Sequence, residues 1–138
     1  MADTIDDALV HRLKNSTAVK AITTRVYPLA LPQSVTLPAI VYQHIDGVAV
    51  QAHGQASALP RQRVQLTFWA STYQEVVNLA HVVRLSLDGY RGNWGTGAYL
   101  TNIQSCLPAG EPRDFRDPDA SLFYRQQDYQ IMYARSTS

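Results

Sequence analysis

Residues 61–87, RQRVQLTFWASTYQEVVNLAHVVRLSL, decide the fold because they combine two clear periodicities. The first ten residues alternate, with Val64, Leu66 and Phe68 on one side of an extended chain and Arg63, Gln65 and Thr67 on the other. This alternation predicts a strand with one buried and one wet face, which favours an antiparallel sheet. Thr72 and Glu75 then form a capping box. The helix that follows, through Leu87, repeats its apolar residues at helical spacing: Val76, Leu79, Ala80, Val83 and Leu87.

The same patterns predict elements on both sides of this unit. Helices are expected over 4–14 and 18–22, and strands over 25–28, 39–45, 99–107 and 122–134. We interpret 48–60 as a long hairpin arm or loop, and 90–98 and 108–119 as irregular segments, because small, Gly, Pro or Asp residues dominate them. This order predicts an α+β fold, with helices packed on one face of a mostly antiparallel sheet. We expect one domain over residues 1–138.

Composition and charge exclude several classes of protein. The chain is 46% hydrophobic and 17% charged, as expected of a folded domain. Twelve Lys and Arg against eleven Asp and Glu leave a net charge of +1, far from the basic excess of a protein that grips many phosphates. The single cysteine, Cys106, excludes an internal disulfide. We expect no signal peptide and no membrane helix, and therefore a protein that is made in, and stays in, the cytoplasm.

The histidines and the cysteine are the first candidates for catalysis or metal binding. The four histidines are His11, His44, His53 and His81. None has the i, i+4 partner and glutamate of a helical zinc site, and His11 and His81 are expected on solvated helix faces. Asp46 could orient the His44 imidazole, but no nucleophile lies beside them, so a strand end is favoured. For Cys106 a buried, inert thiol is favoured over a nucleophile.

Three further patterns are weighed against simpler explanations. Asp114, Asp117 and Asp119 lack the ligand spacing of a calcium loop, so a solvated turn is favoured. The glycines of 92–97 follow a helix rather than a strand and lack the Lys-Ser/Thr of a phosphate loop, so a turn is favoured there too. Arg61 and Arg63 near Trp69 could bind single-stranded nucleic acid, on a thin basis of two arginines. We therefore predict no catalytic residue, no metal and no cofactor.

Four segments together resemble a family of phage proteins. They are 25–28 (RVYP) with 37–42 (LPAIVY), 63–70 (RVQLTFWA), 72–75 (TYQE) leading into 83–90 (VRLSLDGY), and 129–133 (YQIMY). Their order and spacing resemble the tail-completion, or tail-terminator, proteins that join tail to head in long-tailed bacteriophages. The resemblance covers nearly the whole chain, except 48–60 and 91–98. It supplies no catalytic residues.

The resemblance implies a structural subunit of the virion, located in the tail or neck. Such a subunit forms a six-fold ring that caps the tail tube, stops tube polymerisation and offers a surface to the head. Its expected partners are other copies of itself, the tail tube protein and a head-closure or neck protein. DNA is expected to pass through the ring without specific binding, and no membrane is involved.

Two surfaces are predicted to make the contacts of such a subunit. The first is a sheet face that is too polar to be covered by helices and would line the channel or a ring contact: Arg63, Gln65, Thr67, Gln126, Asp128 and Gln130. The second is a small, polar segment that adds little to a core and would order against a neighbouring subunit or the tube: Gln51, His53, Gln55 and Leu59.

Two other functions stay open at this point. The first is another component of the same particle, a head-closure or neck subunit. A small-ligand or regulatory α+β module with no viral role is more distant. Neighbouring genes would distinguish them, because tail-tube and tape-measure genes beside this one would support the tail.

Overall fold

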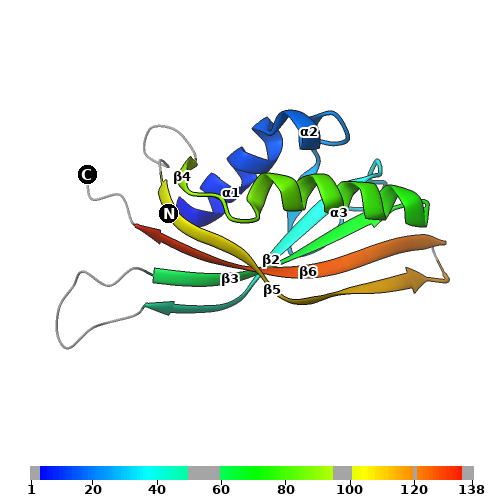
Figure 1. Ribbon diagram of the computed structural model, residues 1–138. Helices are drawn as coiled ribbons and strands as arrows, with labels where there is room; N and C mark the ends of the chain where they lie inside the picture. Colours follow the sequence, from blue (N-terminus) through cyan, green and yellow to red (C-terminus); the bar gives the residue numbers. More distant parts are fainter. Residues whose placement is uncertain (1–3, 50–59, 95–100, 120, 135–138) are drawn as a thin grey trace.

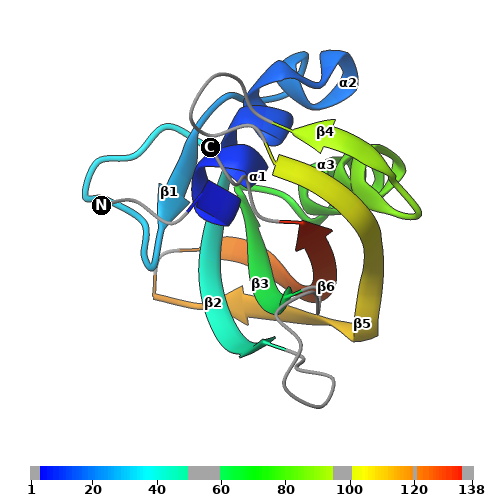
Figure 2. The same cartoon turned by 90° about the vertical axis from the view of Figure 1, so that its left-hand side faces the viewer.

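Six strands form a curled sheet in the computed structural model, which describes residues 4–49, 60–94, 101–119 and 121–134 (Figures 1 and 2). The strands are β1 (Val26–Pro28), β2 (Ala39–Ala49), β3 (Pro60–Ala70), β4 (Gly92–Trp94), β5 (Thr101–Asp117) and β6 (Leu122–Ala134). Their order across the sheet is β1-β2-β3-β6-β5-β4. β1 and β2 run parallel, and the other neighbours are antiparallel. The predicted α+β class and the mostly antiparallel sheet are confirmed.

Three helices accompany the sheet: α1 (Thr4–Asn15), α2 (Thr17–Lys20) and α3 (Tyr73–Leu87). The predicted capping box opens α3, because the Thr72 hydroxyl oxygen accepts from the Glu75 N–H at 3.2 Å. The helix ends before Gly89, whose φ of +72° favours glycine and whose N–H donates to the Cys106 carbonyl at 2.7 Å. Arg12 of α1 donates to the Ser86 carbonyl at 2.9 Å, so the last turn of α3 is tied to both α1 and β5.

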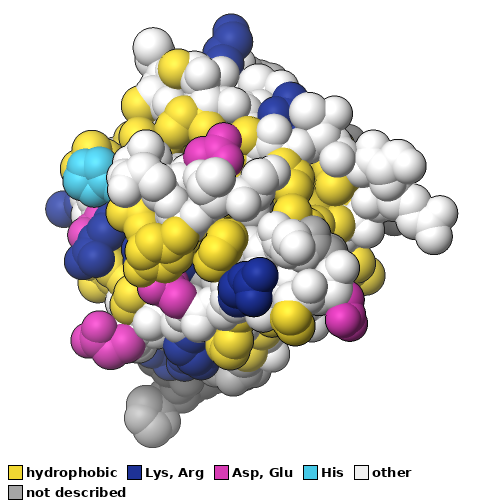
Figure 3. All heavy atoms as spheres, turned by 90° about the vertical axis from the view of Figure 1, so that its right-hand side faces the viewer, with side chains coloured by type: hydrophobic (Ala, Val, Ile, Leu, Met, Phe, Trp, Pro, Cys, Tyr) yellow, Lys and Arg dark blue, Asp and Glu magenta, His cyan; other side chains and the backbone are white. Residues whose placement is uncertain are grey.

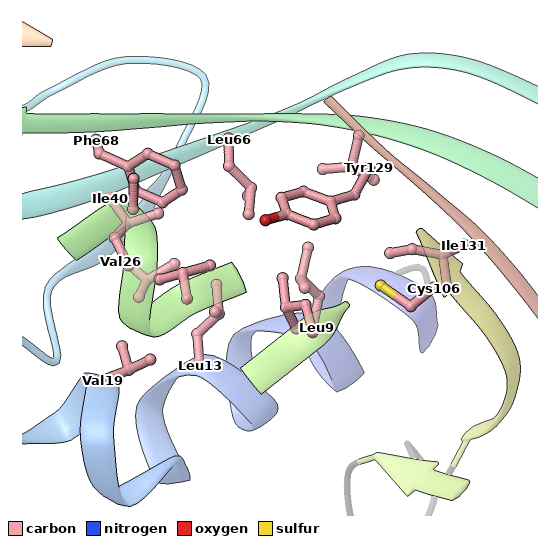
Figure 4. Close-up of a cluster of buried hydrophobic side chains, with 14 of the residues drawn as sticks. Leu9, Leu13, Val19, Val26, Ile40, Leu66, Phe68, Cys106, Tyr129 and Ile131 are labelled. Carbon is pink, nitrogen blue, oxygen red and sulfur yellow. The ribbon is translucent and has the colours of Figure 1, made fainter. Parts of the chain in front are cut away.

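One cluster of buried side chains joins the helices to the sheet. Val64, Leu66 and Phe68, predicted for the buried side of their strand, are all buried in this cluster, together with Tyr129 and Ile131 of β6. We call this side of the sheet the core face. α3 contacts β3 and β6, and α1 contacts β1, β4 and β5. Figure 4 shows side chains of the sheet and the helices pointing toward one another across this space.

The prediction for the second half of the chain was wrong in two places. β5 continues to Asp117, through the segment 108–119 that its Pro and Asp residues marked as irregular. A bulge between Ala109 and Arg113 absorbs the irregularity, with Gly110 at φ +84° and its carbonyl accepting from the Gln127 amide at 3.2 Å. The segment 90–98, interpreted as a loop, contains β4.

The two outermost strands are short and cover only part of their neighbours. β1 pairs with Ile40 to Tyr42 of β2, and β4 pairs with Thr101 to Ile103 of β5. Both neighbours are much longer, since β2 ends at Ala49 and β5 ends at Asp117. In the described part of the chain, the remaining outer edges of β2 and β5 therefore have no strand paired to them.

Candidate functional site

The six residues predicted for the polar sheet face do lie together on one face, opposite the core face. The register pairs Arg63 with Gln130, Gln65 with Asp128, and Thr67 with Gln126 across β3 and β6. Side chains of directly opposed residues project to the same side, and alternate residues of a strand project to opposite sides. We call these six residues the polar strip.

Burial within the polar strip is uneven. Thr67 and Asp128 are buried, Gln65 and Gln126 are half-buried, and Arg63 and Gln130 are exposed. The strip is therefore not a uniformly wet surface.

Asp128 is the centre of a charge cluster on this strip. Its Oδ2 accepts from Arg63 Nε at 3.0 Å and from Nη2 at 2.8 Å. Its Oδ1 lies 3.9 Å from Nη2 of Arg113, which reaches over from β5. Arg113 joins the face because the β5 register pairs it with Gln126. The sequence pattern did not include Arg113, because its strand was interpreted as irregular.

A row of stacked aromatic rings continues the same face beyond the polar strip. Trp69 stacks on Tyr124 with ring centroids 4.3 Å apart, and Tyr124 stacks on Phe115 at 5.0 Å. The row thus crosses β3, β6 and β5. Phe115 is 41% exposed. The sequence did not predict a place for Phe115 on this face, because the segment 108–119 was interpreted as irregular and β5 extends through it to Asp117.

The core face carries a second charge cluster, near the start of α3. Asp114 accepts from Arg125 Nε at 2.6 Å and from the Tyr73 hydroxyl at 2.8 Å. The hydrogen bond from Arg125, reinforced by Tyr73, holds the pKa of Asp114 below its usual value. Figure 3 views the end of the molecule where α3 begins, and shows hydrophobic side chains gathered between basic and acidic ones. The three-carboxylate turn is corrected: Asp114 lies in a strand and is paired.

A hollow of about 370 Å³ lies between α3 and the sheet on this side. Phe68 and Tyr129 contribute apolar surface, while His81, Arg84 and Arg125 contribute polar groups. The lining side chains include no Ser, Thr or Cys that His81 could activate as a nucleophile. The hollow has the mixed lining of a contact surface.

The catalytic candidates are scattered in the structure. His81 is exposed, His11 and His44 are half-buried, and His53 lies outside the described residues. Cys106 is fully buried, and burial raises its pKa to about 12. Within the described ranges, no three His, Cys, Asp or Glu residues are grouped to hold a metal ion. The helices in those ranges are all too short or too polar to cross a membrane.

For the predicted contact segment, the structure describes only the strands that precede and follow it. Gln51, His53, Gln55 and Leu59 lie outside the described residues. The ladder between β2 and β3 continues as far as Ala49 opposite Pro60, so the segment connects two paired strands, as expected of a hairpin arm.

Comparison with known proteins decides the family. The family model described as "Tail completion protein gp17" matches residues 7–134. The chain belongs to this family. A solved chain from "Virion of native gene transfer agent (GTA) particle" has a similar fold, with a TM-score of 0.66 and 12% sequence identity. The alignment covers 91% of this chain and 90% of that chain, and at this identity the likeness shows the fold alone. No curated protein matches the sequence.

As a tail completion protein, the chain is a structural subunit of the virion and a component of the phage tail. The matched range includes every strand of the sheet and most of α1. The polar strip and the aromatic row therefore lie within the part shared with the family.

Proposed function

We propose that this tail completion protein forms a six-fold ring that caps the tail tube, stops tube polymerisation and joins the tail to the head. Each subunit would be one domain over residues 1–138. Its partners would be other copies of itself, the tail tube protein and a head-closure or neck protein. In this proposal α1 and α3 form the cover of the core face, which leaves the polar strip for assembly or for the channel.

The observation that carries the proposal is a pair of sheet edges that other strands cover only partly in the portion of the chain that the structure describes. β2 beyond Tyr42 and β5 beyond Ile103 lie at opposite sides of the sheet. An edge presents unpaired backbone donors and acceptors that favour pairing with another strand. Contacts between two different edges are head-to-tail, and head-to-tail contacts close into a ring when the rotation permits.

The composition of the polar strip supports a place beside DNA. Its side chains are mostly neutral and polar, and the Arg63 guanidinium is paired with Asp128. A channel face of this kind would let the phosphate backbone slide past, because few phosphates would be neutralised by it. The hairpin connection at 50–59 would then contact the tube or a neighbouring subunit.

Electron microscopy of tails tests the proposal directly. We expect two-dimensional class averages of wild-type tails to show a terminal six-fold ring, and tails from a null mutant to lack it and to vary in length. A tag on the C-terminus should label that end. A protein found only free in lysates, or inside capsids, would contradict the ring. Label on the head vertex of tail-less heads would favour the head-closure alternative instead.

A further inference from the structure

Asp128 occupies a special position on the polar strip, because it is the acidic group between two arginines from different strands. Its side chain is only 8% exposed, whereas Arg63 and Arg113 are 45% and 53% exposed. β6 lies between β3 and β5 in the sheet, so the two guanidinium groups approach the carboxylate from opposite sides. Diagonal neighbours across a sheet are within reach of such long side chains.

The two carboxylate oxygens are divided between the two arginines. Arg63 donates twice to Oδ2. Oδ1 is buried, has no hydrogen-bond partner among the described residues, and faces Arg113 at 3.9 Å. Burying a carboxylate oxygen away from water costs free energy, unless a nearby cation compensates for the lost hydration. Asp128 is therefore held in place by Arg63, and its carboxylate lies close enough to both guanidinium groups to offset part of the charge of each.

Without Asp128, the same face would present two guanidinium groups to whatever passes it. Guanidinium is the side-chain group best suited to phosphate, because its donors match two phosphate oxygens at once. The aromatic row of Trp69, Tyr124 and Phe115 lies on the same face, and proteins that bind nucleic acid often combine such rings with cationic groups. The face thus contains the cationic and aromatic groups that nucleic-acid sites use, and it also contains the Asp128 carboxylate, which offsets part of the charge of the two arginines.

We propose that Asp128 sets the specificity of the polar strip: it keeps Arg63 and Arg113 from holding the phosphate backbone of DNA. This inference rests on the proposed function, which places the strip beside DNA, and deepens it by naming the residue responsible. Arg63 and Arg113 serve to fix the Asp128 carboxylate and to join β3, β6 and β5, rather than to bind nucleic acid.

The expected size of the effect follows from counterion release. Each neutralised phosphate steepens the dependence of log affinity on log salt by about 0.9 for double-stranded DNA. Asp128→Asn raises the charge of this cluster by one, so the loss of affinity between 50 and 200 mM salt would be about 3.5-fold greater than in wild type, per subunit. An effect of this size is measurable by elution from a column of double-stranded DNA.

The test compares Asp128→Asn with Asp114→Asn in the full chain. Both variants remove one arginine-paired carboxylate and change the net charge equally, but Asp114 lies on the core face and pairs with Arg125. We expect Asp128→Asn to elute from the DNA column at higher salt than wild type, and Asp114→Asn to elute with wild type. Adding Arg113→Gln to Asp128→Asn restores the net charge of this cluster and should return elution to the wild-type position.

Elution of the two Asn variants at equal salt would overturn the proposal, since DNA binding would then depend on the net charge of the protein and not on the position of Asp128. Arg113→Gln, at an exposed position, tests the idea even if Asp128→Asn fails to fold. We expect it to shift elution less than Asp128→Asn does, because the Asp128 carboxylate 3.9 Å away offsets part of the charge of Arg113. A shift to earlier elution as large as the opposite shift of Asp128→Asn would show that Arg113 binds DNA in the native protein. These measurements use the purified subunit, so they fail or succeed independently of the ring in tails.

Discussion

Removing one phenylalanine from each face of the sheet tests which face is covered in the free subunit. Phe68 lies on the core face and is fully buried, whereas Phe115 lies on the face of the polar strip and is 41% exposed. The same change, Phe→Ala, deletes identical atoms at both positions. Any difference between the two variants therefore reports on their surroundings.

The structure predicts a different loss in the free energy of unfolding for each variant. Phe68→Ala leaves a cavity beneath α3 and should lower the free energy of unfolding by about 3–5 kcal/mol. Phe115→Ala loses its stacking on Tyr124, worth about 0.5–1.5 kcal/mol, and the partial burial of its ring, worth about 1 kcal/mol more. For 138 residues the entropy of unfolding is about 0.3 kcal/mol/K. We therefore expect Tm to fall by about 14 °C for Phe68→Ala and by about 7 °C for Phe115→Ala.

Calorimetry on the purified subunit, at a concentration where it is monomeric, measures both values. A fall for Phe115→Ala as large as that for Phe68→Ala would mean that the polar face is covered within the subunit, and the reasoning about a free assembly face would be refuted. A fall of only a few degrees for Phe68→Ala would show instead that α3 does not pack on this face.

Four further outcomes are expected. Deleting Gln51–Ala58 should leave Tm nearly unchanged but abolish tail joining in a complementation assay, and a large fall in Tm would place the segment in the core. Thr72→Ala should cost about 1 kcal/mol in a urea titration, with Thr72→Ser close to wild type. Because the folded pKa of Asp114 is depressed, its contribution to stability is present above its unfolded pKa and is lost as pH falls through the folded value; wild type and Asp114→Asn should differ in Tm at neutral pH and converge in acid. Folded His44→Ala and Cys106→Ala should still join tails, and loss of joining would indicate chemistry at either site.

The periodicity of the sequence was sufficient to predict the strand and the helix at the centre of the fold, β3 and α3. The alternation of Val64, Leu66 and Phe68 and the capping box at Thr72 are local signals, and the structure contains β3 and α3 where they predict them. The polar strip was predictable for the same reason, since β3 and β6 each show a regular period of two. What the sequence could not show is that these two strands are neighbours, which depends on pairing across more than fifty residues.

The edge of the sheet was harder to predict, because an edge strand tolerates residues that a central strand excludes. Pro108 lies within β5 opposite Tyr129, and β4 covers β5 only as far as Ile103. On an uncovered edge, a missing N–H costs no ladder hydrogen bond. Local composition therefore indicated a loop, while pairing with β6 made a strand. Arg113 and Phe115 were missed as a result.

The burial of Cys106 has a practical consequence. It is the only cysteine of the chain, it is fully buried, and its thiol pKa is raised to about 12. At pH 8 only about one thiol in ten thousand would be the reactive thiolate, even before access is considered. A cysteine introduced on the surface of the native protein would therefore react with maleimides and crosslinkers almost without background. Single cysteines placed along the outer edges of β2 and β5 could then report, by disulfide trapping between subunits, which strands meet in the assembled tail.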